Sequence, residues 1–130
     1  MLDQLRKYRI LPAVIWLILM LIALLSPGDQ IPKTPEIPFK DKIVHFGLFF
    51  VLNILWLRVQ NRNKCGKNFI RKFFTIYLVF GVLIAILVEY LQLYVPNRSF
   101  DYQDITANIL GGTVGIICFY ILYKKESKLV

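Results

Sequence analysis

The chain has 130 residues, of which 57% are hydrophobic, and its formal net charge is +8. Soluble domains usually hold about 45–50% apolar residues and do not gather them into long blocks. Here the apolar residues form four blocks, each close to the ~20 residues that span a bilayer core. The composition therefore excludes an ordinary soluble domain and predicts an all-α integral membrane bundle of four transmembrane helices, as one domain over residues 1–130.

The basic residues are concentrated in three stretches of the chain. They precede the first apolar block, separate the second from the third, and follow the fourth: Arg6, Lys7, Arg9; Arg58, Arg62, Lys64, Lys67, Arg71, Lys72; Lys124, Lys125, Lys128. By the positive-inside rule, this distribution predicts that both termini are cytoplasmic. It also accounts for nearly all of the net charge, so membrane lipids are the expected partners and nucleic acid is not.

The first predicted span covers residues 10–25, and the second covers residues 42–57. A basic start followed by an apolar run also fits a signal peptide. No small-x-small cleavage site follows, however, and Pro27 lies where a peptidase would act, so an uncleaved span is predicted. Four prolines between the spans favour an extended, stiff connection. Asp41 and His45 enter the second span one helical turn apart, at the outer end.

The third and fourth predicted spans, residues 73–95 and 105–123, each carry small and polar residues at helical spacing. They are Gly81, Ala85, Glu89 and Gln92 in the third span, and Asp101, Asp104, Asn108, Gly111 and Gly115 around and in the fourth. At ~100° per residue, each set falls on one face of its helix. Small residues four apart let helices approach closely. Because the chain reverses between these spans, we expect the two faces to pack together.

Eight polar residues are then expected to meet in a pocket at the outer end of the bundle. They are Asp41, His45, Glu89, Gln92, Arg98, Asp101, Asp104 and Asn108. Glu89 is the leading candidate for function, because a buried acid is costly in a membrane protein. We expect it to reach Asp104 or Asn108 by a hydrogen bond, directly or through one water, with Arg98 above them as the countercharge.

Several of these residues have a simpler structural interpretation. His45 fits an interhelical hydrogen bond as well as proton chemistry, and Asp104 fits a helix N-cap. Arg98 fits either neutralisation of a neighbouring acid or binding of an anionic ligand. With a single histidine and no second soft ligand, neither a metal ion nor a cofactor is predicted. Cys65 and Cys118 fall in different parts of the chain, so no disulfide is expected.

Three motifs in chain order carry a family resemblance. They are Asp41-Lys42-x-x-His45-x-x-x-Phe49, then Glu89-x-x-Gln92 with Pro96-x-Arg98, then Asp101-x-x-Asp104-x-x-x-Asn108-x-x-Gly111. Together they resemble the VanZ-like family over essentially the whole chain. Asn97 is a departure, since a glycine is common at that place in the family.

The resemblance implies a small multi-span protein of the bacterial cytoplasmic membrane. The family's namesake is an accessory protein that lowers susceptibility to teicoplanin without altering the peptidoglycan precursor. The expected function is thus an accessory factor that binds a lipid-linked or amphiphilic ligand. The alternative is an intramembrane enzyme that modifies a lipid-linked headgroup by acid–base chemistry at Glu89 and His45. A homo-oligomer is compatible with either function.

Overall fold

The computed structural model describes residues 2–28, 39–60 and 69–125. The helices are α1 (Leu2–Leu25), α2 (Lys40–Gln60), α3 (Phe69–Ile76), the π-helical segment η2 (Tyr77–Leu83), α4 (Ile84–Gln92) and α5 (Tyr102–Lys124). The segments α3, η2 and α4 follow one another without a gap and form one long helix. The described residues therefore contain four helices that are long and apolar enough to cross a membrane, as predicted.

The helix bounds agree with the predicted spans to within a few residues, except at the start of α1. That helix begins at Leu2 rather than near residue 10, and the third span ends at Gln92 rather than at residue 95. Most of the proline-rich connection (29–38) and of the basic loop with Cys65 (61–68) lies outside the described residues. Cys118 in α5 is a free, half-buried thiol.

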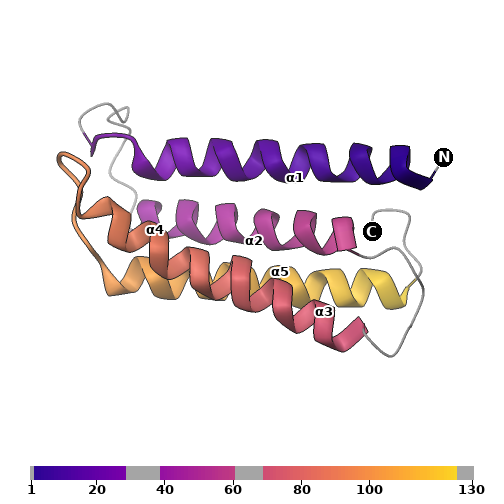
Figure 1. Ribbon diagram of the computed structural model, residues 1–130. Coiled ribbons are helices and arrows are strands. Elements are labelled where there is room, and N and C mark those ends of the chain that lie inside the picture. Colours follow the sequence, from indigo (N-terminus) through magenta and orange to yellow (C-terminus); the bar gives the residue numbers. More distant parts are fainter. Residues whose placement is uncertain (1, 29–38, 61–68, 126–130) are drawn as a thin grey trace.

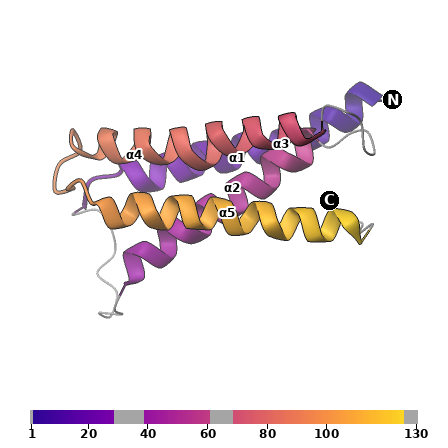
Figure 2. The same ribbon diagram turned by 90° about the horizontal axis from the view of Figure 1, so that it is seen from below.

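The helices run side by side, with α2 between α1 and α5 (Figure 1). The most extensive helix contact is the one between α2 and α5, which cross at an angle in the second view (Figure 2). Helix α1 begins and α5 ends at the same end of the bundle. At the opposite end, which we call the turn end, α1 and α4 finish and α2 and α5 begin.

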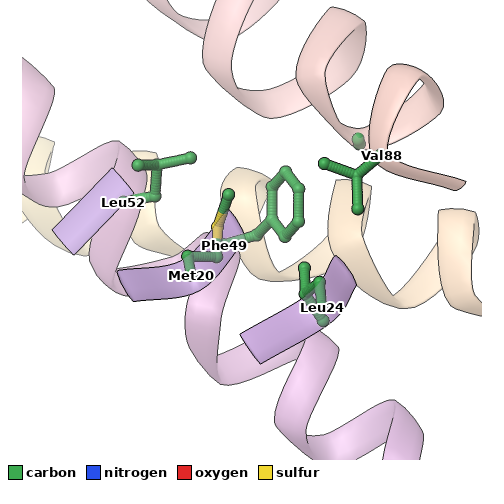
Figure 3. Close-up of a cluster of buried hydrophobic side chains, with 6 residues drawn as sticks. Met20, Leu24, Phe49, Leu52 and Val88 are labelled. Atoms are coloured by element: carbon green, nitrogen blue, oxygen red, sulfur yellow. The ribbon is translucent and has the colours of Figure 1, made fainter. Parts of the chain in front are cut away.

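The apolar core joins α1, α2 and α4. Its buried side chains are Met20 and Leu24, Phe49 and Leu52, and Ala85 and Val88 (Figure 3). Phe49 lies among side chains from all three helices and is fully buried. Toward the other end, Trp56 of α2 stacks on Phe80 of η2 with 4.2 Å between ring centroids. Because most large apolar side chains on the outer faces are exposed, the bundle presents lipid-compatible surfaces around this core.

The small residues of α5 pack differently from the prediction. A Cβ atom at Gly111 would collide with the carbonyl oxygen of Phe46, and one at Gly115 would crowd that of Phe50. The face of α5 that carries Gly111 and Gly115 therefore lies against α2 and not against the third span. The prediction that this face packs against Gly81 and Ala85 is wrong. Gly112, one residue further round the helix, faces the third span instead. A Cβ there would lie 3.2 Å from the Cα of Gly81.

The π-helical segment explains part of this difference. Residues Tyr77–Leu83 turn less per residue than an α-helix, so positions before and after them are not in simple 3.6-residue register. The predicted face assumed a regular α-helix from Gly81 to Gln92. In addition, consecutive glycines at 111 and 112 point in directions about 100° apart, so the spacing of small residues alone did not select the packed face.

The glycine contact leads to a stability prediction with a matched control. Gly111→Ala should destabilise the protein by about 1–3 kcal/mol, because the new methyl group forces α2 and α5 apart. Gly47→Ala, where a Cβ would meet no atom within 4 Å, should instead stabilise α2 by up to ~1 kcal/mol through helix propensity. Thermal unfolding of both variants in detergent micelles measures the contrast. Equal effects of the two substitutions would contradict the close contact.

Candidate functional site

A cluster of polar side chains lies at the turn end of the bundle. It consists of Asp41, Lys42 and His45 of α2, Glu89 of α4, Asp101 just before α5, and Asp104 and Asn108 of α5; we call it the end cluster. His45, Glu89 and Asn108 are fully buried, and Asp104 is 5% exposed. The close contact of α2 with α5 is what brings most of these residues together, since it places the first turns of both helices side by side.

The start of α5 fixes two of the acids. Asp101 has an extended backbone (φ −133°, ψ 120°), and its side chain accepts a hydrogen bond from the backbone N–H of Gln103 at 2.8 Å. It is therefore the N-cap of α5. The alternative interpretation of Asp104 as the N-cap is wrong. Asp104 lies in the first turn of the helix, where the N-terminal end of the helix dipole favours a negative charge.

Lys42 supplies the countercharge to these acids. Its Nζ lies 2.9 Å from Oδ2 of Asp101 and 2.9 Å from Oδ1 of Asp104. The hydrogen bond from Lys42, followed by that from the Gln103 amide, lowers the pKa of Asp101 below its ordinary value of 3.8. Lys42 was not among the eight residues that the sequence placed in the pocket. Its place beside Asp41, at the start of the same motif, was the signal that pointed to the cluster.

His45 is held in a defined orientation by α5. Its Nδ1 lies 3.0 Å from Oδ1 of Asn108. Its Nε2 lies 4.0 Å from Oδ1 of Asp41 and 3.9 Å from Oδ2 of Asp104. Within the described part of the chain, this buried Nε2 has no hydrogen-bond partner. His45 thus makes an interhelical hydrogen bond through Nδ1 and keeps a second ring nitrogen, Nε2, without a partner among the described residues.

Glu89 enters the cluster from α4. One carboxylate oxygen, Oε1, accepts a hydrogen bond from the backbone N–H of Asp101 at 3.1 Å. The other, Oε2, is buried and has no partner among residues 2–28, 39–60 and 69–125. While a bond through one water stays a prediction, the predicted direct hydrogen bond between Glu89 and Asp104 or Asn108 is thus replaced by one from the backbone N–H of Asp101 at the start of α5. This bond joins the third span to the N-cap of the fourth.

Gln92 and Arg98 serve the end of α1 instead of the acids. Gln92 Nε2 donates to the carbonyl of Leu24 at 2.9 Å. Arg98 donates from Nε to the carbonyl of Ser26 at 3.3 Å and from its guanidinium to that of Ala23 at 3.5 Å. The last carbonyls of a helix lack partners within the helix, and these side chains supply them. The expectation that Arg98 neutralises the acids is therefore corrected, because Lys42 does so.

The chemistry available at the end cluster follows from its charges. Four carboxyl groups surround one ammonium group and one imidazole, so the ionised cluster would carry an excess of negative charge. Such a site favours protons, cations and groups that donate hydrogen bonds. Asp41, His45 and Asp104 can each offer one metal-ligating atom, and these atoms lie within 4.8 Å of one another. The sequence placed these three residues in one pocket but did not predict a metal ion there.

Removal of the lysine tests the electrostatic balance of the end cluster. Lys42→Met should lower the free energy of unfolding at pH 7 by roughly 1–2 kcal/mol, between the values of exposed and buried ion pairs. Since the pKa of Asp101 is lowered in the folded chain, its ion pair stabilises the fold above pH 3.8 and is lost as the pH falls through the lowered value. The difference between wild type and variant should therefore shrink in acid.

The control is Lys40→Met, which removes the same charge from the same helix outside the end cluster. Unfolding midpoints of the three proteins, measured from pH 7 to pH 3, give the comparison. A Lys42 variant that unfolds like the Lys40 variant at every pH would contradict the bridging role of Lys42.

Comparison with known proteins places this arrangement in a family. The VanZ/LLP1 family matches residues 8–123, from α1 to the last turn of α5. A protein of Schizosaccharomyces pombe, whose name describes it as uncharacterized, is 30% identical over 116 residues. The aligned part is 88% of this chain and 64% of that protein, so the chain spans less than two thirds of the relative's length. No solved structure matches the chain.

The match includes every residue of the end cluster and all four long helices. It confirms the resemblance carried by the three sequence motifs. Since the relative comes from fission yeast, family membership does not by itself assign a bacterial source. The chain is a multi-pass membrane protein that belongs to the VanZ/LLP1 family.

Proposed function

We propose that the end cluster binds the polar headgroup of a lipid-linked or amphiphilic ligand. The observation that carries the proposal is the pair of unused polar atoms, Nε2 of His45 and Oε2 of Glu89. Both are buried, and the described residues offer neither of them a hydrogen bond. A buried polar group without a partner costs about 1–3 kcal/mol, and ionisable groups within a membrane are kept mainly for function. A ligand that bonds to both atoms would remove this cost.

The exposure of the cluster supports an approach from the turn end. The side chains of Asp41 and Asp101 are 58% and 39% exposed, whereas His45 and Glu89 beneath them are fully buried. A headgroup would therefore meet the two aspartates first and would reach the unused atoms once these exposed side chains move aside. Three aromatic side chains lie at the same end. The ring centroid of Phe100 is 5.4 Å from that of Tyr90 and 4.8 Å from that of Tyr102. Aromatic side chains favour the headgroup level of a bilayer.

The charges favour a particular kind of headgroup. Lys42 already serves two aspartates, so the cluster offers acceptors more readily than it offers a free cation. Hydroxyl or ammonium groups, as in a lipid-linked sugar or a lipoglycopeptide, match these acceptors. In a bacterial cytoplasmic membrane, such binding would make the protein an accessory factor that lowers susceptibility to teicoplanin-type glycopeptides.

A second candidate function is acid–base catalysis on the headgroup. It is favoured by the way in which both groups are oriented: Asn108 holds His45 through Nδ1, and the Asp101 amide holds Glu89 through Oε1. Each side chain thus has one anchored and one unused atom, as a general acid or base requires. In this case the ligand would be a substrate whose headgroup changes.

The test for both functions uses lipids that copurify with the protein. Wild type, His45→Gln, Glu89→Gln and the control Thr113→Val are expressed in the same host and analysed by native mass spectrometry. Thr113 lies outside the end cluster and bonds to Tyr77 at 2.9 Å, so its valine variant removes a polar group elsewhere in the bundle. We expect a lipid class enriched on wild type and on Thr113→Val, and at least ~tenfold depleted on the two cluster variants, as for the loss of a charge-assisted hydrogen bond.

The total lipid composition of the membranes distinguishes the two functions. An unchanged headgroup composition with selective copurification supports the binding function. A headgroup that is altered only when wild type or Thr113→Val is present supports the enzyme. If all four proteins carry the same lipids in bulk proportions and leave the membrane composition unchanged, the proposal is wrong.

A further inference from the structure

We propose that Asp41, His45 and Asp104 form a binding site for a divalent transition-metal ion, Zn²⁺ or Mn²⁺. This goes beyond headgroup binding, because the ion takes Nε2 of His45 itself, and a headgroup would then bind at Oε2 of Glu89 and at the open coordination position of the ion. The site joins two helices: Asp41 and His45 lie in the first turns of α2, and Asp104 lies in the first turn of α5. One ion would thus bind across the most extensive helix contact of the bundle.

The distances suit a shared ion. Imidazole and carboxylate ligands bind Zn²⁺ at about 2.0–2.2 Å, so two ligand atoms of a tetrahedral ion are ~3.4 Å apart. Nε2 of His45 lies 4.0 Å from Asp41 Oδ1 and 3.9 Å from Asp104 Oδ2, each about half an ångström longer than this spacing. The three ligand atoms lie within 4.8 Å of one another. The exposed Asp41 side chain can close the remaining difference by rotation about its own bonds.

The imidazole has the orientation of a metal ligand. If Nδ1 donates its proton to the side-chain carbonyl of Asn108, the lone pair of Nε2 points toward two carboxylate groups. Metal-binding histidines usually donate their other N–H in this way, which fixes the tautomer and the ring. A lone pair beside two carboxylates repels them, and no donor among the described residues relieves the repulsion. A cation between the three groups would relieve it.

A proton on Nε2 fits the geometry less well than a metal ion does. The N–O separations of 3.9 and 4.0 Å exceed the 2.7–3.2 Å of a hydrogen bond, so a proton would bond to neither carboxylate. A metal ion between the three groups would bind all of them once the carboxylate groups move inward by about half an ångström.

The outer contacts of Asp104 leave one oxygen for the ion. Lys42 binds Oδ1 at 2.9 Å, while Oδ2 is the oxygen that faces His45. The lysine therefore orients the carboxylate without occupying the ligating atom. One imidazole with two carboxylates selects Zn²⁺ or Mn²⁺ over Mg²⁺, which prefers oxygen ligands alone, and over Cu⁺, which prefers sulfur. Three protein ligands leave a coordination position for water or a hydroxyl group.

The single histidine of the chain permits a direct test. The full chain, purified with a histidine-free tag and labelled with ¹⁵N-histidine, is placed in phosphatidylcholine nanodiscs that contain no added ligand. Titration with Zn²⁺ should shift the Nε2 resonance with a stoichiometry of one, while Nδ1 keeps its proton. Calorimetry should show affinity reduced at least ~tenfold in Asp41→Asn, since even the loss of a hydrogen-bond partner behind a ligand costs about 10–100-fold.

Thr113→Val is the control, since Thr113 bonds to Tyr77 outside the end cluster and belongs neither to the headgroup site nor to the three metal ligands. Its Zn²⁺ affinity should stay within about threefold of wild type, less than a ligand loss causes. Because Asp41 is exposed, Asp41→Asn should fold normally. A Nε2 resonance that responds to pH but not to Zn²⁺ or Mn²⁺, or equal affinities of Asp41→Asn and wild type, would overturn the metal site. Either result would leave headgroup binding to be decided by the copurified lipids.

Discussion

The close approach of α2 and α5 is the contact on which the rest of the structure depends. Gly111 and Gly115 let the α5 backbone rest against the carbonyl groups of Phe46 and Phe50. In a bilayer, lipid tails compete equally well for apolar side chains, so packing of this kind must hold helices together. His45 immediately precedes Phe46, and Asn108 lies one turn before Gly111. The glycine contact therefore sets the distance at which these two polar side chains meet.

The end cluster combines stabilising and destabilising elements. Lys42 bridges Asp101 and Asp104, and Asp101 both caps α5 and binds Glu89 through its backbone amide. Beside these satisfied contacts lie buried atoms of His45, Glu89 and Asn108 that the described residues leave without partners. A membrane protein that needed only stability would gain from apolar residues at these positions. We therefore interpret the unsatisfied atoms as the binding surface and the satisfied ones as its support.

The sequence predicted the four spans and most of the end cluster. The length and hydropathy of a segment determine whether it forms a helix across a bilayer, and polar residues at the ends of such helices are costly enough to indicate a site. The sequence did not predict the partners. Consecutive glycines and the π-helical segment made the packed face of α5 ambiguous. The sequence favoured Arg98 as the countercharge and did not indicate Lys42. Which cation neutralises the acids depended on the end of α1, where Arg98 donates hydrogen bonds to carbonyl groups. Such competition between distant segments is visible only in three dimensions.

Detection of the contact between His45 and Asn108 tests this arrangement most directly, because the two side chains meet only if α2 and α5 pack through Gly111 and Gly115. Solid-state NMR of the protein in lipid, with ¹⁵N-histidine and ¹³C-asparagine labels, reports it. The account predicts a through-space correlation between the His45 ring nitrogen and an asparagine side-chain carbon, consistent with the separation of 3.0 Å between Nδ1 and Oδ1. This correlation should vanish in Asn108→Ala. Its absence from the wild-type protein, or its persistence in Asn108→Ala, would contradict the arrangement.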